Sequence, residues 1–108
     1  MPAMAAPLAA DKLEAWEAFA GQLTGPRQAE FHDMNERHGL TDHRAYLQPT
    51  PDGQYLVLVM IEGSGADGFM PSVTQSDHEF DRWFTESVID LHGFDLSAPM
   101  PPLAARRI

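Results

Sequence analysis

The clearest hydrophobic pattern lies late in the chain, where apolar side chains recur every three or four residues. Ser76 stands three residues before Glu79, which is the spacing of a capping box at a helix N-terminus. Gly93 is typical of a helix C-terminus. The pattern predicts a helix from about Asp77 to His92. Its aromatic and aliphatic positions are Phe80, Trp83, Phe84, Val88 and Leu91.

An earlier segment shows the same period. Asp11 is a suitable N-cap, and the apolar positions after it predict a helix from about Asp11 to Leu23. Gly25 and Pro26 then interrupt the pattern. Because proline is tolerated in the first turn of a helix, we expect a second helical segment over 26–38, which Gly39 ends.

The middle of the chain predicts two strands joined by a tight turn. A short strand is expected over 44–48 and a nearly all-apolar one over 55–61, with turn residues between them. A strand that is apolar at successive positions is typically covered on both faces. The glycine-rich stretch 63–68 indicates a flexible link, followed by a short helix around 67–74.

Two weaker segments flank these elements. Residues 3–9 are apolar and could form a first strand, although Pro7 would place it at an edge or a strand end. The tail, 97–108, holds three prolines and is read as an extended arm or a weak last strand. Residues 1–8 would be an arm in the same way if the first strand did not form.

This order of elements predicts one α+β domain over residues 1–108, with a ferredoxin-like βαββαβ layout and an antiparallel sheet. Its first and last strands are the weak ones. Helices would cover one face of such a sheet, whereas 55–61 is apolar on both sides. A homodimer that packs sheet against sheet would cover the second face. The alternative is a monomer covered there by its own N-terminal segment and tail.

Composition narrows the function classes. The chain has 108 residues, 16 Asp and Glu against 7 Lys and Arg, and a net charge of −9, which argues against nucleic acid and anionic membranes as partners. The absence of cysteine excludes disulfides, thiolate catalysis and cysteine-ligated metal centres. Without a membrane-length apolar run or a basic, signal-like start, the expected location is the cytoplasm.

Several segments together carry a resemblance. They are SDHEFDRWF at 76–84, LHGFDL at 91–96, YLQPTP at 46–51, IEG at 61–63, APL at 6–8 and EAW at 14–16. The chain resembles an uncharacterised bacterial family in the dimeric α+β-barrel (ferredoxin-like) superfamily, distantly similar to proteins of the antibiotic-biosynthesis-monooxygenase type. Its short, alanine-rich first strand departs from that pattern. The resemblance implies the fold and a dimer, but no established activity.

The best acid–base candidate is His92, with Asp95 three residues on to orient the imidazole. Tyr46 completes the predicted catalytic set as a hydrogen-bonding group, and His43 could join it at the mouth of a pocket. The alternative is that His92 only interacts with the dipole and last carbonyls of its helix. Asp81 would be solvated or paired with Arg82 or Arg44.

The aromatic stripe has two interpretations as well. It either packs as ordinary core or lines an apolar cavity between helices and sheet, as pockets in the resembled superfamily do. On the second interpretation the ligand-binding residues are Trp16, Phe31, Met34, Met60, Phe80, Trp83 and Phe84. His32, Glu36, His38 and His43 match no standard metal-ligand spacing, so we expect no metal and no cofactor.

Two function classes follow. The first, implied by the resemblance, is a small-molecule-binding protein that could act as a cofactor-independent enzyme of the monooxygenase, cyclase or isomerase type on an aromatic or polyketide-like substrate. The second is a non-enzymatic ligand-binding or protein-interaction module. A cavity with converging polar groups would favour the first class, and an apolar cavity without them would favour the second.

Overall fold

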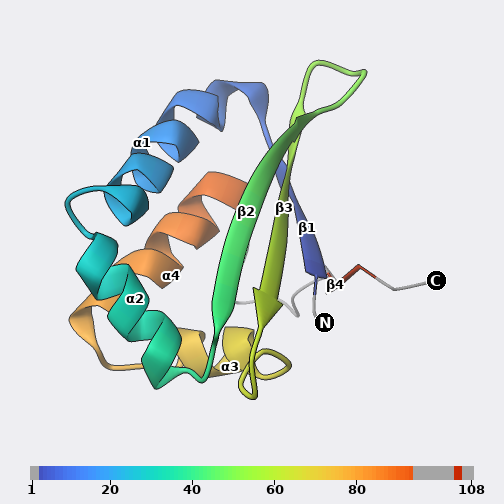
Figure 1. Cartoon of the computed structure of the whole chain (residues 1–108). Helices are drawn as coiled ribbons and strands as arrows, with labels where there is room; N and C mark the ends of the chain where they lie inside the picture. The colour runs from blue at the N-terminus through green and yellow to red at the C-terminus, as the bar shows by residue number, and fades with distance from the viewer. Residues whose placement is uncertain (1–2, 94–103, 106–108) are drawn as a thin grey trace.

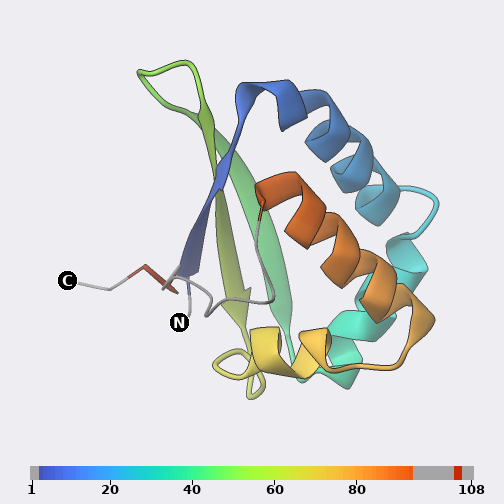
Figure 2. The same cartoon turned by 180° about the vertical axis from the view of Figure 1, so that it is seen from behind.

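The fold consists of two layers, an antiparallel sheet and a set of helices that cover one of its faces (Figures 1 and 2). The computed structural model describes residues 3–93 and 104–105. The chain is therefore an α+β protein, as its pattern predicts. Among the described residues, no helix is both long and apolar enough to cross a membrane.

The sheet has the strand order β2-β3-β1-β4, and each neighbouring pair is antiparallel. The expected first strand forms despite Pro7. Proline has no amide hydrogen to donate to a neighbouring strand. In the described part of the β1–β4 pairing β4 meets only Ala3 and Met4, so Pro7 interrupts no hydrogen bond there. The strands are β1 (Ala3–Leu8), β2 (Asp42–Pro49), β3 (Tyr55–Glu62) and the two-residue β4 (Ala104–Ala105).

All four predicted helices form, with different boundaries. Asp11 is not the N-cap of the first, because it lies in a 3-10 turn and Lys12 takes that position. Gly25 and Pro26 separate the first two helices, as their sequence predicts. The last helix begins two residues later than expected, and the predicted capping box is wrong. Its N-cap is His78, so Ser76 lies two residues too early; the Ser76 hydroxyl donates to Asp81 and accepts from the His78 amide, and among described residues no side chain caps the helix. The helices are α1 (Leu13–Thr24) after the 3-10 turn η1 (Ala10–Lys12), α2 (Gln28–Arg37), α3 (Phe69–Thr74) and α4 (Glu79–His92).

Alternation along β3 separates the two faces of the sheet. Val57 and Ile61 are buried beneath the helices. Leu56, Leu58 and Met60 point to the opposite face and are partly exposed. Each face of β3 is therefore apolar, as expected, but only the inner face is packed against described helices (Figure 2).

The stretch 63–68 is closely packed where a flexible link was expected. The Gly65 amide donates to the Gly39 carbonyl at 3.0 Å. The backbone of this loop therefore lies directly against the backbone of the turn that follows α2. A Cβ atom on Gly65 would lie 1.8 Å from the carbonyl oxygen of His38. Glycine is required here for close approach and not for freedom of movement.

We therefore expect Gly65→Ala to lower the free energy of unfolding by about 1–3 kcal/mol, as overpacking does. Gly21→Ala is the matched control, because a Cβ at that position in α1 meets nothing within 4 Å. It should stabilise the protein by about 0.5–1 kcal/mol, since alanine favours a helix. Urea denaturation of both variants measures the difference, and equal effects would contradict the packing.

Candidate functional site

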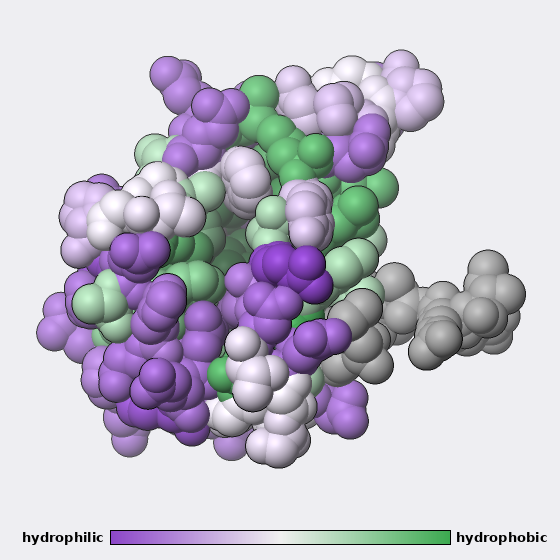
Figure 3. Space-filling view, in the orientation of Figure 1, coloured by the Kyte–Doolittle hydropathy of each residue, from purple (hydrophilic) through white to green (hydrophobic). Residues whose placement is uncertain are grey.

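A cavity of about 230 Å³ lies between the inner face of the sheet and the helices. In the space-filling view it forms a hollow with hydrophobic walls between the helices and β2 (Figure 3). Every helix except the turn η1 contributes to its wall, and so does each of the three long strands. The lining residues are Met4, Ala6, Trp16, Phe19, Ala20, Leu23, Thr24, Phe31, His43, Ala45, Val57, Val59, Phe69, Met70, Phe84, Val88 and His92.

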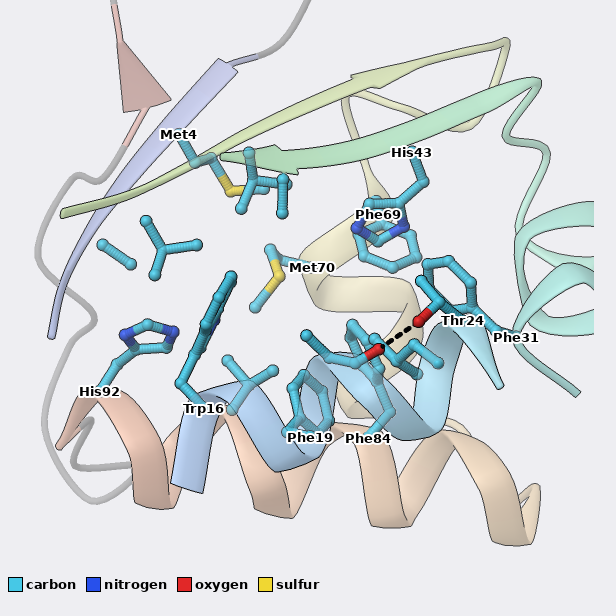
Figure 4. Close-up of a pocket in the computed structure, with 17 residues that line it drawn as sticks. Met4, Trp16, Phe19, Thr24, Phe31, His43, Phe69, Met70, Phe84 and His92 are labelled. Atoms are coloured by element: carbon cyan, nitrogen blue, oxygen red, sulfur yellow. Dashed lines mark hydrogen bonds between the residues drawn. The ribbon is translucent and has the colours of Figure 1, made fainter. Parts of the chain in front are cut away.

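The wall is apolar apart from Thr24, His43 and His92. The Thr24 hydroxyl donates to the Ala20 carbonyl of its own helix at 3.0 Å (Figure 4). The two histidines lie at opposite ends of the cavity in the close-up, His92 beside Trp16 and His43 beside Phe69 (Figure 4). They are the side chains in the wall whose chemistry could be directed at a ligand.

His43 is held in place by Asn35 of α2. Its Nδ1 lies 3.0 Å from the amide oxygen Oδ1 of Asn35. An amide oxygen only accepts hydrogen bonds, so Nδ1 must carry the proton. In the neutral ring the lone pair is then on Nε2, which has no side-chain or backbone partner among residues 3–93 and 104–105. Nε2 also keeps accessible surface, because no buried side-chain nitrogen or oxygen of these residues lacks a partner.

The surroundings of His43 keep the ring neutral. The rings of Phe31, Phe69 and Phe84 have their centroids 5.1, 5.4 and 6.1 Å from that of the imidazole. Burial lowers the pKa of His43 from 6.5 to about 4, against a smaller opposing effect of Asp42. At neutral pH His43 is therefore a hydrogen-bond acceptor in an apolar wall.

His92 sits where α4 ends, as predicted, and its ring also reaches the neighbouring strand. Its Nδ1 donates to the Pro7 carbonyl of β1 at 2.8 Å, which ties the end of α4 to the sheet. Burial lowers the pKa of His92, and the Pro7 carbonyl partly opposes this. Asp95, its expected orienting partner, lies outside the described residues.

Tyr46 is not brought to the cavity. It lies three positions after His43 along β2, so it points to the opposite, outer face of the sheet, where it is 47% exposed. Its hydroxyl lies 3.5 Å from Nη1 of Arg44 on that face. The structure therefore does not bring Tyr46 and His92 together.

The predicted ligand-binding residues are divided. Trp16, Phe31 and Phe84 line the cavity. Met34 and Phe80 are fully buried in the core and are not part of its wall. Met60 lies on the outer sheet face, by the alternation of β3.

Trp83 also lies away from the cavity. The Arg27 guanidinium stacks on its ring at 4.3 Å, on the outer side of the helical layer. The wall also contains three residues that the sequence pattern did not indicate, Met4, Phe69 and Met70. The alternation of β1 could have indicated Met4, whereas Pro71 weakened the prediction of α3.

A second polar cluster joins α2, α3 and α4 outside the cavity. Asp81 is fully buried and accepts two hydrogen bonds from Arg37, at 2.7 and 2.8 Å. Ser76 donates to it at 2.6 Å, and Nε2 of His38 lies 2.7 Å away. The expected pairing with Arg82 or Arg44 is wrong. Asp81 lies on the buried side of α4, where it meets Arg37 at the end of α2.

The electrostatics of this cluster are those of a satisfied ion pair. Burial alone would raise the pKa of Asp81, but the hydrogen bonds from Arg37, Ser76 and His38 outweigh it and hold the pKa well below its usual range. Nδ1 of His38 also lies 2.7 Å from the Ser72 hydroxyl of α3. The cluster thus fastens three helices together. Among the described residues, no group of three or more acidic or histidine side chains is placed to hold a metal ion.

Comparison with known proteins found no match. No family model, no curated protein and no solved structure matches this chain. The resemblance to dimeric α+β-barrel proteins therefore stays a prediction. What the site can do has to be argued from its own geometry.

Proposed function

We propose that the protein binds a small, largely apolar molecule in the cavity between the sheet and the helices. The observation that carries this proposal is a largely apolar wall in which Asn35 orients His43, whose Nε2 is an acceptor with no partner among the described residues. An apolar cavity of about 150 Å³ is known to hold one benzene ring. The 230 Å³ of this cavity therefore suits a molecule of one or two rings.

Catalysis receives less support from the same geometry. A general base works best with a pKa near the operating pH, whereas the pKa of His43 is about 4. Taking a proton from a phenol of pKa ~10 would then be uphill by about 8 kcal/mol. A cofactor-independent enzyme would have to rely on His92, which lies at the other end of the cavity (Figure 4).

The proposed fold is ferredoxin-like. Its support is the strand order β2-β3-β1-β4, with helices between β1 and β2 and again between β3 and β4.

A homodimer through the outer face of the sheet belongs to the same proposal. Leu56, Leu58 and Met60 form a partly exposed apolar row there, which a second copy would cover. Sedimentation velocity should show a dimer, and Leu58→Glu should shift it to a monomer. Gln28→Glu, which adds the same charge at an exposed position of α2 away from the outer sheet face, is the control. A wild-type monomer would contradict the dimer and leave ligand binding intact.

Ligand binding is tested with toluene, an apolar molecule of one ring. Ala20→Leu adds three carbons to the wall on the α1 side, whereas Ala18→Leu makes the same change outside the cavity. We expect Ala20→Leu to weaken toluene binding by about tenfold or more, and Ala18→Leu to leave it unchanged. Amide NMR shifts report both affinity and location. Shifts that avoid Val57, Val59 and Phe84 would contradict the proposed site.

A further inference from the structure

We propose that the ligand is an uncharged aromatic molecule carrying a hydroxyl or N–H donor, and that Asn35 sets this preference by holding the His43 proton on Nδ1. This inference rests on the proposed ligand binding and goes further, because it specifies the polar group of the ligand. His43 would touch that group. Asn35 does not line the cavity and acts as a positioning residue.

The first step is the direction of the hydrogen bond. A neutral imidazole has one donor and one acceptor nitrogen, and which is which depends on the partner of the other nitrogen. The Asn35 oxygen takes the Nδ1 proton at 3.0 Å. Nε2 can then only accept. A ligand that donates would pair with it, whereas a ketone or ether would leave two acceptors facing each other unpaired.

The second step is the charge of the ligand. The described wall contains no lysine, arginine, aspartate or glutamate, and burial keeps His43 neutral. A carboxylate or phenolate in this cavity would lose its hydration without gaining a counter-charge. The ligand class is therefore a neutral phenol, an indole or a similar ring with one donor.

The third step is the shape of the end of the cavity that holds His43. Phe31, Phe69 and Phe84 surround the imidazole, and two of these rings meet it edge to face. All three also line the cavity. A ring whose donor reaches Nε2 would lie among these aromatic faces, where offset and edge-to-face contacts are favourable. The remaining wall toward Trp16 and His92 has room for a further apolar part (Figure 4).

The experiment compares phenol with toluene, which differ by a hydroxyl in place of a methyl group, near neutral pH where phenol is uncharged. The quantity of interest is the ratio of the two dissociation constants, toluene over phenol. His43→Phe keeps an aromatic ring in the wall and removes the acceptor. We expect it to lower this ratio by about tenfold or more, and it should bind toluene at least as well as the wild type.

Asn35 is tested by a pair of variants. Asn35→Leu removes the acceptor for the Nδ1 proton and should lower the ratio several-fold. Asn35→Asp keeps an acceptor there and should retain the preference at a pH of about 8–9, where the ring stays neutral beside the added carboxylate and phenol is still uncharged. The ¹⁵N shifts of the His43 ring give a readout that a purely structural role would not move. In the wild type Nε2 should be unprotonated, and phenol, but not toluene, should shift it.

The outcomes separate the two proposals. If neither phenol nor toluene binds in the cavity, the proposed function itself fails. If both bind and the ratio is the same in wild type and His43→Phe, ligand binding stands and the donor requirement is overturned. A wild-type ¹⁵N spectrum with the proton on Nε2 would overturn the role of Asn35, whatever the variants do.

Discussion

Asp81→Ala is expected to lower the free energy of unfolding by about 3–5 kcal/mol, the range for removing one partner of a buried ion pair. The substitution leaves the Arg37 guanidinium without its bidentate partner and withdraws the acceptor from Ser76 and His38. Arg37 is 31% exposed and keeps Asp33, which favours the lower half of the range. Urea denaturation followed by circular dichroism gives the value.

Asp33→Ala provides a matched control on the same arginine. Asp33 accepts from Nε of Arg37 at 2.7 Å, the same distance as the shorter Asp81 bond, but its side chain is 55% exposed. Exposed pairs of this kind contribute about 0–1 kcal/mol. Equal losses for Asp33→Ala and Asp81→Ala would show that burial of Asp81 is not what makes its pair important.

The second large effect is a loss of stability as the pH falls from 6.5 toward 4. Burial lowers the pKa of His43 to about 4 in the folded protein, so between these values the unfolded chain binds the extra proton. The stability is complete above pH 6.5 and is lost as the pH approaches 4. With about 1.4 kcal/mol for each pH unit, the loss is about 3 kcal/mol. Burial of His92 acts in the same direction.

The measurement is the free energy of unfolding in urea at several values of pH across this range. His43→Phe should remove most of the slope, because phenylalanine does not titrate. His32→Ala, at an exposed position of α2, should keep the wild-type slope. An unchanged slope in His43→Phe would contradict the burial of a neutral imidazole. Below about pH 3.8 the stability should fall again as the Asp81 carboxylate is protonated, since its pKa is lowered in the fold.

Local patterns predict most elements of this fold and little of its site. The period of α4 and the apolar run of β3 depend on neighbours within a few residues, and both segments form close to where they are expected. Ser76 makes a contact that the local pattern does not predict. Its spacing from Glu79 fits a capping box, but its hydroxyl bonds Asp81, which is itself held by Arg37 from 44 residues away. No pattern within one helix reveals that pairing.

The place of His43 in the cavity wall could have been predicted from the sequence. The predicted strand over 44–48 begins two residues later than β2 and so leaves out His43. A strand that began at Asp42 would have placed His43, Ala45 and Leu47 on one face, toward the helices. The same alternation would have placed Tyr46 on the opposite face. The donor direction of His43 could not have been predicted, because it depends on Asn35, which lies in another element and contacts it only in the folded chain.

The Asp81 cluster holds three helices together at a place separate from the cavity. Its residues fasten α2, α3 and α4 without entering the cavity wall, which is almost entirely made of interchangeable apolar side chains. Wall positions outside the buried core, such as Ala20 and Ala45, can therefore change in size while the Asp81 cluster keeps these helices together. Such an arrangement suits evolutionary change of ligand choice, and it equally makes the chain a starting scaffold for sensors of small aromatic molecules.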